Sequence, residues 1–117
     1  MIITIPFRTP SVNKLYWNWK GRQIKTKIAK DLEKTIIDLV PKMSIKGRKL
    51  RVVMNVVENW YFKNGNVARK DVDNRTKFIL DAVFKGLEED DRYVFSLSIN
   101  KIQSFTEEKS VIMIEEL

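Results

Sequence analysis

The spacing of apolar residues changes twice between residues 50 and 99, and this succession constrains the fold more than any other feature of the chain. Residues 50–57 form an almost continuous apolar run rich in β-branched side chains, which is typical of a central strand buried on both faces. Within residues 78–87 the apolar side chains recur with the helical period, and within residues 93–100 they alternate as in a strand. The chain is therefore expected to combine strands and helices in one α+β unit.

Shorter signals complete this outline. Residues 2–7 alternate like an opening strand, Thr26 is in position to cap a helix that Pro41 ends, and residues 111–114 predict a closing strand. The capped helix is expected to bury a stripe made of Ile28, Leu32, Ile36 and Leu39. Residues 9–25, which precede this helix, are interpreted as an irregular loop.

These elements predict an α+β fold with a mixed sheet of about four to five strands, two main helices and the order β-α-β-(β)-α-β-β. The length of 117 residues fits a single small domain over residues 1–117. The strand in parentheses stands for residues 59–68, where the pair Asn64-Gly65 indicates a hairpin or a basic loop whose tip approaches DNA. Lys85 and Gly86 suit the C-terminus of the second helix.

The chain contains no histidine and no cysteine. This excludes Ser-His-Asp hydrolysis, zinc hydrolases and thiol nucleophiles, so that carboxylates, lysine, tyrosine and bound water must do any chemistry. No apolar run reaches the roughly 18 to 20 residues that span a bilayer, and residues 1–10 do not have the pattern of a signal peptide. We therefore expect a cytoplasmic protein without membrane contact.

The formal net charge is +7, and the positive charges are unevenly placed. Between Arg8 and Lys30 there are seven cations and no acid, which favours a polyanionic partner because each neutralised phosphate releases counterions. The aromatic residues among these cations are suited to stack on bases. The candidate DNA-binding residues are Lys14, Tyr16, Lys20, Arg22, Lys25, Lys63, Arg69 and Lys70. In the alternative interpretation, the cations keep the domain soluble and the aromatic side chains fill its core.

Acidic residues gather in the second half of this basic chain. Asp71 and Asp73 stand two positions apart at the entrance of the second helix, so their side chains point to the same side of an extended segment. Asp90 and Asp91 open the following strand. If that strand returns beside the helix entrance, three carboxylates come close enough to repel one another unless a cation lies between them. Hard oxygen ligands of this kind suit Mg²⁺ or Mn²⁺, which also hold a DNA phosphate.

Each of these acids also has a purely structural interpretation. Asp73 or Asn74 can cap the helix, Lys77 and Asp81 stand one turn apart and can form an ion pair, and the pair Asp90-Asp91 can be a solvated turn. Taken singly, such features are common. The combination of a DxDN entrance, a lysine one turn later and a DD pair before the next strand favours a shared cation site.

The run DVDNRTKFILDAVFKGLEEDDRYV resembles the signature of RusA-type Holliday-junction resolvases, in which a DxDNxxK…D…G…DD pattern forms the active site. The segment PFRTPSVNKLYW resembles the family's PxxPSxNxxY pattern, and the strand after the DD pair ends in Lys101, as it does in many members. The resemblance covers nearly the whole chain. It implies a homodimeric endodeoxyribonuclease of DNA recombination and repair, commonly of prophage origin, that resolves four-way junctions by paired symmetric incisions. It also implies dependence on Mg²⁺, for which Mn²⁺ can substitute, and no nucleotide cofactor.

By the same resemblance, the site consists of three metal-binding carboxylates, one essential basic residue and two supporting residues. These are, in that order, Asp71, Asp73 and Asp91, then Lys77, then Asn74 and Asp81. Glu88 and Glu89 stand where members of the family usually carry apolar residues, so Asp90 is kept as the second choice for the third ligand. The basic residue is expected to stabilise the added negative charge or to orient the attacking water.

Two other functions are compatible with the same residues. One is a basic DNA-binding module without catalysis, in which the acids only cap helices and face solvent. The other is a less selective nuclease with the same metal chemistry, which cuts flaps, replication forks or other branched DNA.

Overall fold

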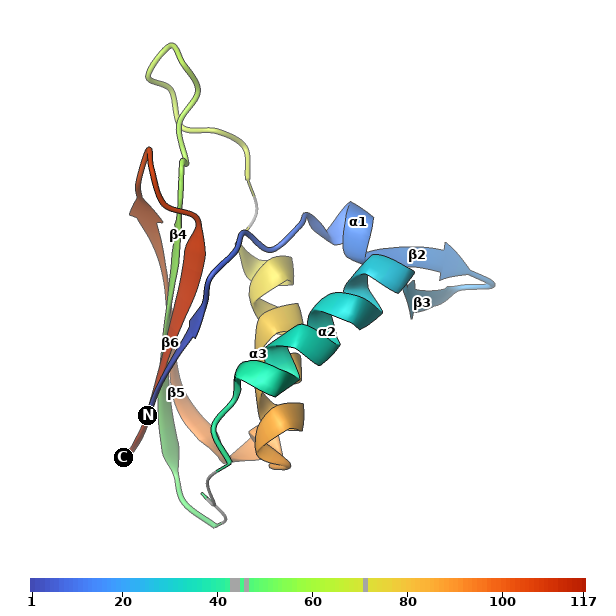
Figure 1. Ribbon diagram of the computed structural model, residues 1–117, viewed down its shortest axis with the longest axis vertical. Helices are drawn as coiled ribbons and strands as arrows, with labels where there is room; N and C mark the ends of the chain where they lie inside the picture. The colour runs from blue at the N-terminus through green and yellow to red at the C-terminus, as the bar shows by residue number, and fades with distance from the viewer. Residues whose placement is uncertain (43–44, 46, 71) are drawn as a thin grey trace.

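The computed structural model describes residues 1–42, 45, 47–70 and 72–117, and for Val12, Asn13, Asp73 and Asn74 it describes the backbone alone. The main elements are β1 (Ile2–Ile5), α2 (Lys27–Leu39), β4 (Leu50–Glu58), α3 (Asp73–Leu87), β5 (Val94–Gln103) and β6 (Lys109–Glu116). The four strands form one mixed sheet, and the two helices cover one of its faces (Figure 1). The predicted α+β class, with a mixed sheet and two main helices, is confirmed. In the described part of the chain, no helix is both long and apolar enough to cross a membrane.

Strand β4 lies inside the sheet, whose order is β1-β6-β4-β5. It pairs antiparallel with β6 and parallel with β5. A parallel pair needs a crossover connection, and α3 provides it on the helical side. The chain therefore passes from the end of β4 to the first turn of α3, and from the last turn of α3 to the start of β5.

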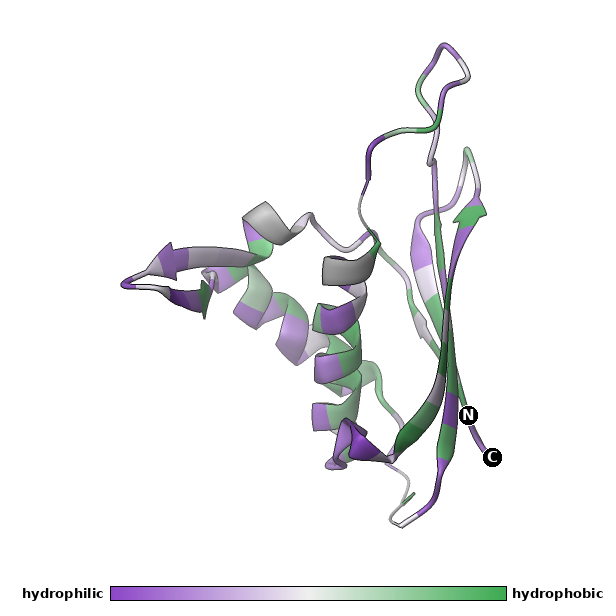
Figure 2. Ribbon diagram, turned by 180° about the vertical axis from the view of Figure 1, so that it is seen from behind, coloured by the Kyte–Doolittle hydropathy of each residue, from purple (hydrophilic) through white to green (hydrophobic). Residues whose placement is uncertain are grey.

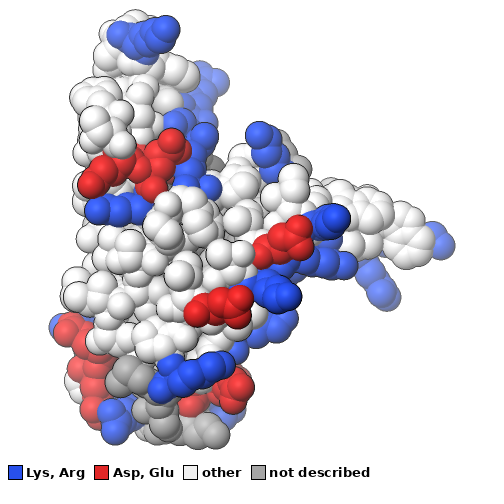
Figure 3. Space-filling model, in the orientation of Figure 1, with Lys and Arg blue, Asp and Glu red and all other residues white. Residues whose placement is uncertain are grey.

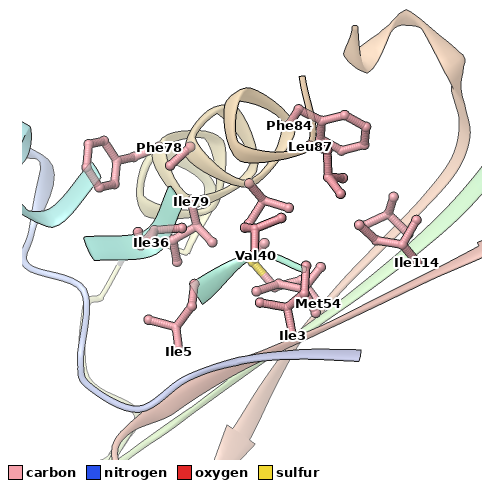
Figure 4. Close-up of a cluster of buried hydrophobic side chains, with 14 of the residues drawn as sticks. Ile3, Ile5, Ile36, Val40, Met54, Phe78, Ile79, Phe84, Leu87 and Ile114 are labelled. Carbon is pink, nitrogen blue, oxygen red and sulfur yellow. The ribbon is translucent and has the colours of Figure 1, made fainter. Parts of the chain in front are cut away.

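The hydrophobic core lies between the two helices and the sheet (Figure 4). It takes alternate side chains from the strands, such as Ile3 and Ile5 of β1, and one stripe from each helix, such as Phe78 and Ile79 of α3. In Figure 2 the apolar side of α3 faces the sheet and its polar side faces away from it. Each fully buried side chain of this size stabilises the fold by roughly 1.5–3 kcal/mol, so the core fixes how α3 stands on the sheet.

Helix α2 begins as the sequence predicts, but its buried stripe differs. The hydroxyl of Thr26 accepts a hydrogen bond from the amide of Ala29 at 3.1 Å, which confirms the predicted cap. The helical turns bury Ala29 and Ile36, and Val40 is buried just after the last turn. The exposed members of the predicted stripe are Ile28 at 54% and Leu39 at 40%. The observed stripe lies next to the predicted one on the helix surface, and the small side chain of Ala29 allows close packing there.

The segment predicted as an irregular loop contains regular structure. A short helix, α1 (Val12–Leu15), precedes an antiparallel hairpin of β2 (Tyr16–Trp19) and β3 (Arg22–Lys25), which projects from the molecule (Figure 1). The turn residues Lys20 and Gly21 have φ angles of 48° and 75°, and two-residue turns of type I′ need this left-handed conformation at both positions. The loop prediction is wrong because a Lys-Gly pair is a weaker hairpin signal than Asn-Gly and the strands are too short to show an alternation.

Lys85 and Gly86 lie in the last turn of α3, as predicted, but Gly86 is not the residue that takes the left-handed conformation at the helix end. The helix continues to Leu87, and Glu88 takes the left-handed conformation after it, with a φ of 57°. A Cβ atom on Gly86 would lie 3.0 Å from the Cβ of Val40 and 3.3 Å from the Cα of Ile37. The glycine is therefore needed for the close approach of α2 to α3.

We expect Gly86→Ala to destabilise the protein by about 1–3 kcal/mol, because the added methyl group would overlap Val40. At a helical position with free space around it, alanine is more stable than glycine by about 1 kcal/mol. The cost of the overlap at position 86 must exceed this gain for the variant to be less stable. Urea unfolding measures the difference. In a matched experiment with Val40→Ala as background, the cost should shrink because one of the overlapping methyl groups is gone. A more stable Gly86→Ala variant would contradict the packing role.

Candidate active site

One edge of α3 carries charged residues at intervals of one turn. Asp73, Lys77, Asp81 and Lys85 are each four positions apart. The side chains of Lys77, Asp81 and Lys85 are exposed. The edge therefore leads from the entrance of the helix to its last turn as a line of alternating charge.

The first turn of α3 has no side-chain cap, and a hydroxyl group binds a backbone carbonyl there. Asp73 and Asn74 are the first two residues of the helix, and the N-cap is Val72, which makes no side-chain cap hydrogen bond. The predicted capping role of Asp73 or Asn74 is thus wrong, because the helix begins one residue earlier than a cap would require. The hydroxyl of Thr76 donates to the carbonyl oxygen of Val72 at 2.5 Å. Asp71 lies outside the described residues.

The DD pair follows the last turn of α3. Asp90 caps a 3-10 helix, η1 (Asp91–Tyr93), because its carboxylate accepts a hydrogen bond from the amide of Arg92 at 2.9 Å. Asp91 is the first residue of η1, and its side chain is exposed. An open hollow of about 520 Å³ lies beside it. Five acids line the hollow together with Phe84 and Lys85, and these acids are Asp81, Glu88, Glu89, Asp90 and Asp91. Because Asp90 is engaged as a cap, Asp91 presents the more available carboxylate of the pair.

Asp73 and Asp91 lie toward opposite ends of α3 in one chain. The helix has 15 residues and extends over about 21 Å from first to last, and Asp91 follows the last residue by four positions. The expectation that the start of β5 returns beside the helix entrance is wrong, because parallel pairing brings the far end of β5 there. The Nζ atom of Lys101, near that end, donates to the carbonyl oxygen of Lys70 at 3.1 Å. Among the residues whose side chains the structure describes, no three acids are placed to hold one metal ion.

Asp81 lies between the two ends of α3 and responds to the charges around it. Burial is the largest cause that raises the pKa of Asp81 above its ordinary value. Lys77 opposes this shift, and Asp91 adds to it. The charges of Asp81 and Asp91 therefore interact, and Lys77 offsets part of their repulsion.

Beside the entrance of α3, a buried glutamate holds three cations. Glu58, the last residue of β4, is 2% exposed. Its Oε1 atom accepts a hydrogen bond from Nη1 of Arg75 at 2.7 Å, and its Oε2 atom accepts from Nε of Arg8 at 3.2 Å and from Nζ of Lys70 at 3.3 Å. These partners compensate the hydration that the carboxylate has lost. We define the Glu58 cluster as Arg8, Glu58, Trp60, Lys70, Arg75 and Lys101.

The ring of Trp60 contacts three cations of the Glu58 cluster. The charged groups of Lys101, Arg75 and Lys70 lie 4.8, 5.1 and 5.8 Å from its centroid, where a cation is attracted to the face of an indole. Nζ of Lys70 also donates to the carbonyl oxygen of Asn59 at 2.5 Å. The cluster thus joins β4, β5 and α3 to residue 70, and so fixes the chain on both sides of position 71.

Glu58, Trp60 and Arg75 are not among the site residues predicted from the sequence, although a signal for two of them is present. Glu58 stands at the end of the strand in line with Leu50, Val52, Met54 and Val56, which alternate toward one face. Arg75 precedes Phe78 and Ile79 by three and four positions, which places it on the buried face of α3. Charged residues are rarely buried without a partner, so two of them at core-facing positions predict a buried ion pair.

Most of the predicted DNA-binding cations are exposed, and they are distributed over several parts of the surface. The exposed ones are Lys14, Lys20, Arg22, Lys63 and Arg69. Figure 3 shows Lys and Arg side chains at the end of the hairpin, along the helices and at the tip of the segment 59–68, with acids between them. This distribution is compatible with a long polyanion that contacts several elements at once.

Three of the predicted DNA-binding residues contact other elements of the protein, whereas Lys20 contacts its neighbour Trp19, with Nζ at 4.6 Å from the ring centroid. The ring of Tyr16 meets that of Phe78 edge to face, with centroids 6.3 Å apart, and burial is the main cause that raises the pKa of Tyr16. Lys25 forms an ion pair with Glu33 of α2. Lys70 belongs to the Glu58 cluster, as described above. We therefore expect these three side chains to contribute less to DNA binding than the exposed cations.

Glu33 joins the hairpin to both helices, and its titration should be visible in the stability of the protein. Burial opposes its ionisation, but hydrogen bonds from Lys25 and Lys85 outweigh burial and lower the pKa of Glu33 below its ordinary value of 4.5. The stabilisation is therefore present above that value and is lost as the pH falls through the lowered pKa. We expect Glu33→Gln to cost about 1 kcal/mol at pH 7 and progressively less as the pH falls below 4.5.

Urea unfolding of both proteins at several pH values measures this effect. Glu115→Gln is the matched control, because its partner Arg51 and Glu115 itself are about half exposed and such surface pairs contribute little. A cost of Glu33→Gln that is the same at pH 3 and pH 7 would argue against an ionic role of Glu33.

Comparison with known protein families identifies the class to which this chain belongs, which is that of DNA endonucleases. A family model described as Endodeoxyribonuclease RusA matches residues 7–115. The chain therefore belongs to the RusA endodeoxyribonuclease family, as its sequence motifs indicated. The matched range includes both the DxDN entrance and the DD pair. A search among curated proteins found no match.

Proposed function

We propose that residues 1–117 form a single RusA-like domain that resolves four-way DNA junctions by Mg²⁺-dependent hydrolysis, in paired symmetric incisions. The observation that carries this proposal is the coincidence of the family match with the pattern of acids and lysine on α3 and η1. The net charge of +7 supports a polyanionic substrate. Branched DNA is favoured over other substrates because the matched family is one of endodeoxyribonucleases and the motifs resemble those of junction resolvases.

We assign Asp71, Asp73 and Asp91 as the metal-binding residues, with Asp90 as the second choice. Carboxylates are the hard oxygen donors that Mg²⁺ and Mn²⁺ prefer, so the donor set fits either ion. Burial is the main cause of the raised pKa of Asp81, and Asp91 adds to it, so Asp91 lies close enough to Asp81 for their charges to interact. When bound, the ion supplies an activated water and neutralises charge on the phosphate.

Lys77 is the basic residue that we assign to catalysis. It lies one turn inside α3, and its side chain is exposed. Its ammonium group would stabilise the negative charge that develops on the phosphate as water adds and the 3′-oxygen leaves. Asp81 interacts electrostatically with Lys77 and would restrain its position, while Asn74 would orient a ligand at the helix entrance.

A second copy of the chain would bring the separated acids together. A two-fold axis that crosses α3 near its middle exchanges the ends of the two helices, so the first turn of one lies beside the last turn of the other. Asp71 and Asp73 of one protomer would then meet the partner's Asp91. The same axis creates two equivalent sites, and a four-way junction presents two equivalent strands to cut.

The start of β5 offers a surface for this contact. Strand β5 is an edge strand, and its residues Phe95 and Leu97 are 62% and 48% exposed. Exposed apolar side chains on an unpaired edge favour association with another chain. Because they follow Asp91 by four and six positions, a partner that buries them would also approach Asp91.

A paired-incision assay on a mobile four-way junction tests the proposed function. The protein should cut two opposed strands symmetrically in Mg²⁺ or Mn²⁺ and neither strand after treatment with EDTA. Flap, fork and duplex substrates of equal length serve as comparisons. Equal cleavage of all branched substrates would favour the less selective nuclease, and no cleavage of any would contradict the proposal.

The exposed cations of the hairpin should determine part of the salt dependence of DNA binding. We expect the double variant Lys20→Gln with Arg22→Gln to reduce the slope of log K against log salt by about one for each phosphate that the protein no longer neutralises. Fluorescence anisotropy with a labelled junction in EDTA measures this slope. Lys34→Gln, an exposed cation of α2, is the control. A double variant with an unaltered slope would show that the hairpin does not contact phosphate.

A further inference from the structure

An aromatic cavity lies beyond the C-terminal end of β4, close to the Glu58 cluster. It is formed between residues 59–68, which we call the arm, and the turn that connects β5 with β6. Its volume is about 510 Å³, and its walls include Tyr61, Phe62 and Phe105, the amides of Asn59 and Gln103, and Lys63. The volume is in the range of about 300 to 1,000 Å³ that small-molecule sites occupy. In Figure 1 the arm and the β5–β6 turn extend beyond the helices at the same end of the molecule.

The arm is held in a defined shape by its own hydrogen bonds. The amide of Phe62 donates to the carbonyl oxygen of Asn66 at 2.8 Å, and the amide of Ala68 donates to that of Trp60 at 2.7 Å. Gly65 takes the left-handed conformation of the turn, with a φ of 87°. A turn is thus present at residues 64–65, but it is not the type I′ turn that the pair Asn64-Gly65 suggests, because Gly65 takes the left-handed conformation and Asn64 does not. The walls of the cavity therefore exist before any ligand arrives.

The amide side chains at the base of the cavity are also fixed. Nε2 of Gln103 donates to Oδ1 of Asn59 at 2.9 Å, and the amide of Trp60 donates to Oε1 of Gln103 at 2.7 Å. These bonds connect the arm to β5 and to the Glu58 cluster. A ligand in the cavity would therefore be held in a fixed relation to the entrance of α3.

The aromatic walls contribute little to folding. Phe105 is 81% exposed, Phe62 53% and Tyr61 41%. Apolar groups left in water gain nothing from the hydrophobic effect, and several of them around one cavity indicate a binding surface. The cavity is thus suited to a ligand with a flat apolar surface.

The charges near the cavity narrow the choice of ligand. Lys63 lines it. Arg8 and Lys70 line an adjoining hollow of about 250 Å³ that also includes Phe105, but both bind Glu58, which lines the same hollow. That second hollow also contains Glu107 and Glu108, which would repel a phosphate placed directly beneath Phe105. An uncharged aromatic group in the cavity, with its backbone phosphate directed toward Lys63 and away from the acids of the second hollow, satisfies both conditions.

We propose that the aromatic cavity receives a nucleobase that has left the stack at the branch point of the DNA. This inference rests on the proposed function, because branched DNA supplies such bases and continuous duplex does not. Stacking on Phe105 and Phe62 provides the contact, and it requires no particular base because every base has a flat face. The cavity therefore contributes selectivity for branched over continuous DNA.

Binding measurements in EDTA test the proposal, because cleavage is then absent. Phe105→Ala and Phe62→Ala should each weaken binding of a four-way junction by about five- to a hundredfold and binding of a duplex by less than about twofold. Phe105→Trp and Phe105→Leu form a matched pair, since tryptophan keeps a stacking surface and leucine keeps only an apolar one. Tryptophan should preserve junction affinity, and leucine should lose it. Because Phe105 is exposed, none of these changes should alter the unfolding curve.

Photocrosslinking identifies the contact directly. With 5-iodouracil at the branch point, crosslinks should map to Tyr61, Phe62 or Phe105, and with the label inside a duplex arm they should not. If the alanine variants bind junctions as the unaltered protein does, or if the crosslinks map elsewhere, the inference is wrong while the proposed function stands. If the unaltered protein neither binds nor cuts any branched DNA, both are wrong.

Discussion

Asp71→Asn is expected to reduce Mg²⁺-dependent cleavage of a four-way junction on the order of a hundredfold or more, because an amide is a far poorer ligand for a hard cation than a carboxylate. Binding of the same junction in EDTA should be unchanged or tighter, since the substitution removes a negative charge that repels phosphate. Single-turnover cleavage and anisotropy measure the two effects separately. A loss of cleavage without a loss of binding is the signature of a metal ligand.

Asp38→Asn is the matched control for this experiment, because Asp38 is an exposed acid of α2 outside the proposed site. It should leave cleavage unchanged. Asp71→Asn with undiminished cleavage would remove Asp71 from the site. A parallel loss of cleavage and of folding would show that the residue supports the structure instead, and circular dichroism of the variant decides between these outcomes.

Glu58→Ala should cause the largest loss of stability, about 3–5 kcal/mol, because it removes the buried carboxylate to which the buried guanidinium of Arg75 donates. Arg8 and Lys70 lose the same partner. The loss should appear in urea unfolding as a lower midpoint with an unchanged slope. The chain on both sides of position 71 depends on these contacts, so cleavage should decrease along with stability.

One further variant of Glu58 separates the effect of its charge from that of its shape, and one variant outside the cluster serves as a control. Glu58→Gln keeps an oxygen that accepts the hydrogen bond of Arg75 but removes the charge, so its cost should lie between zero and that of Glu58→Ala. Glu115→Ala removes a half-exposed partner of Arg51, and its cost should stay within about 0.5 kcal/mol. Equal effects of Glu58→Ala and Glu115→Ala would contradict the buried network.

The elements with a clear apolar period were predicted well from the sequence. The strand at residues 50–57, the helix at 78–87 and the strand from residue 93 correspond to β4, α3 and β5, because period alone separates strand from helix over such lengths. The hairpin of β2 and β3 was missed, since four-residue strands carry too few positions to show alternation. The packing role of Gly86 depends on α2, which is distant in sequence, and no local pattern could reveal it.

The sequence proposes a set of residues for the candidate site, but it does not predict how one chain arranges them. Acids two residues apart, a lysine one turn later and a DD pair could be recognised because each spacing is local. The distance between Asp73 and Asp91 depends on the length of α3 and on the pairing of β5, and this pairing brings Lys101 rather than Asp91 to the helix entrance. The buried pair of Glu58 and Arg75 combines residues from two elements, so it appears only when β4 and α3 are packed together.

Mixing of inactive protomers tests most directly whether a second copy completes the metal site. Asp71→Asn and Asp91→Asn chains, each inactive alone, are co-expressed with different tags so that mixed dimers can be purified. In a mixed dimer one site would combine both substitutions and the other would have neither. We therefore expect mixed dimers to nick one strand of a four-way junction in Mg²⁺, with about half of the sites active. Mixed dimers that cut no strand, although both tags are present, would contradict a site shared between two chains.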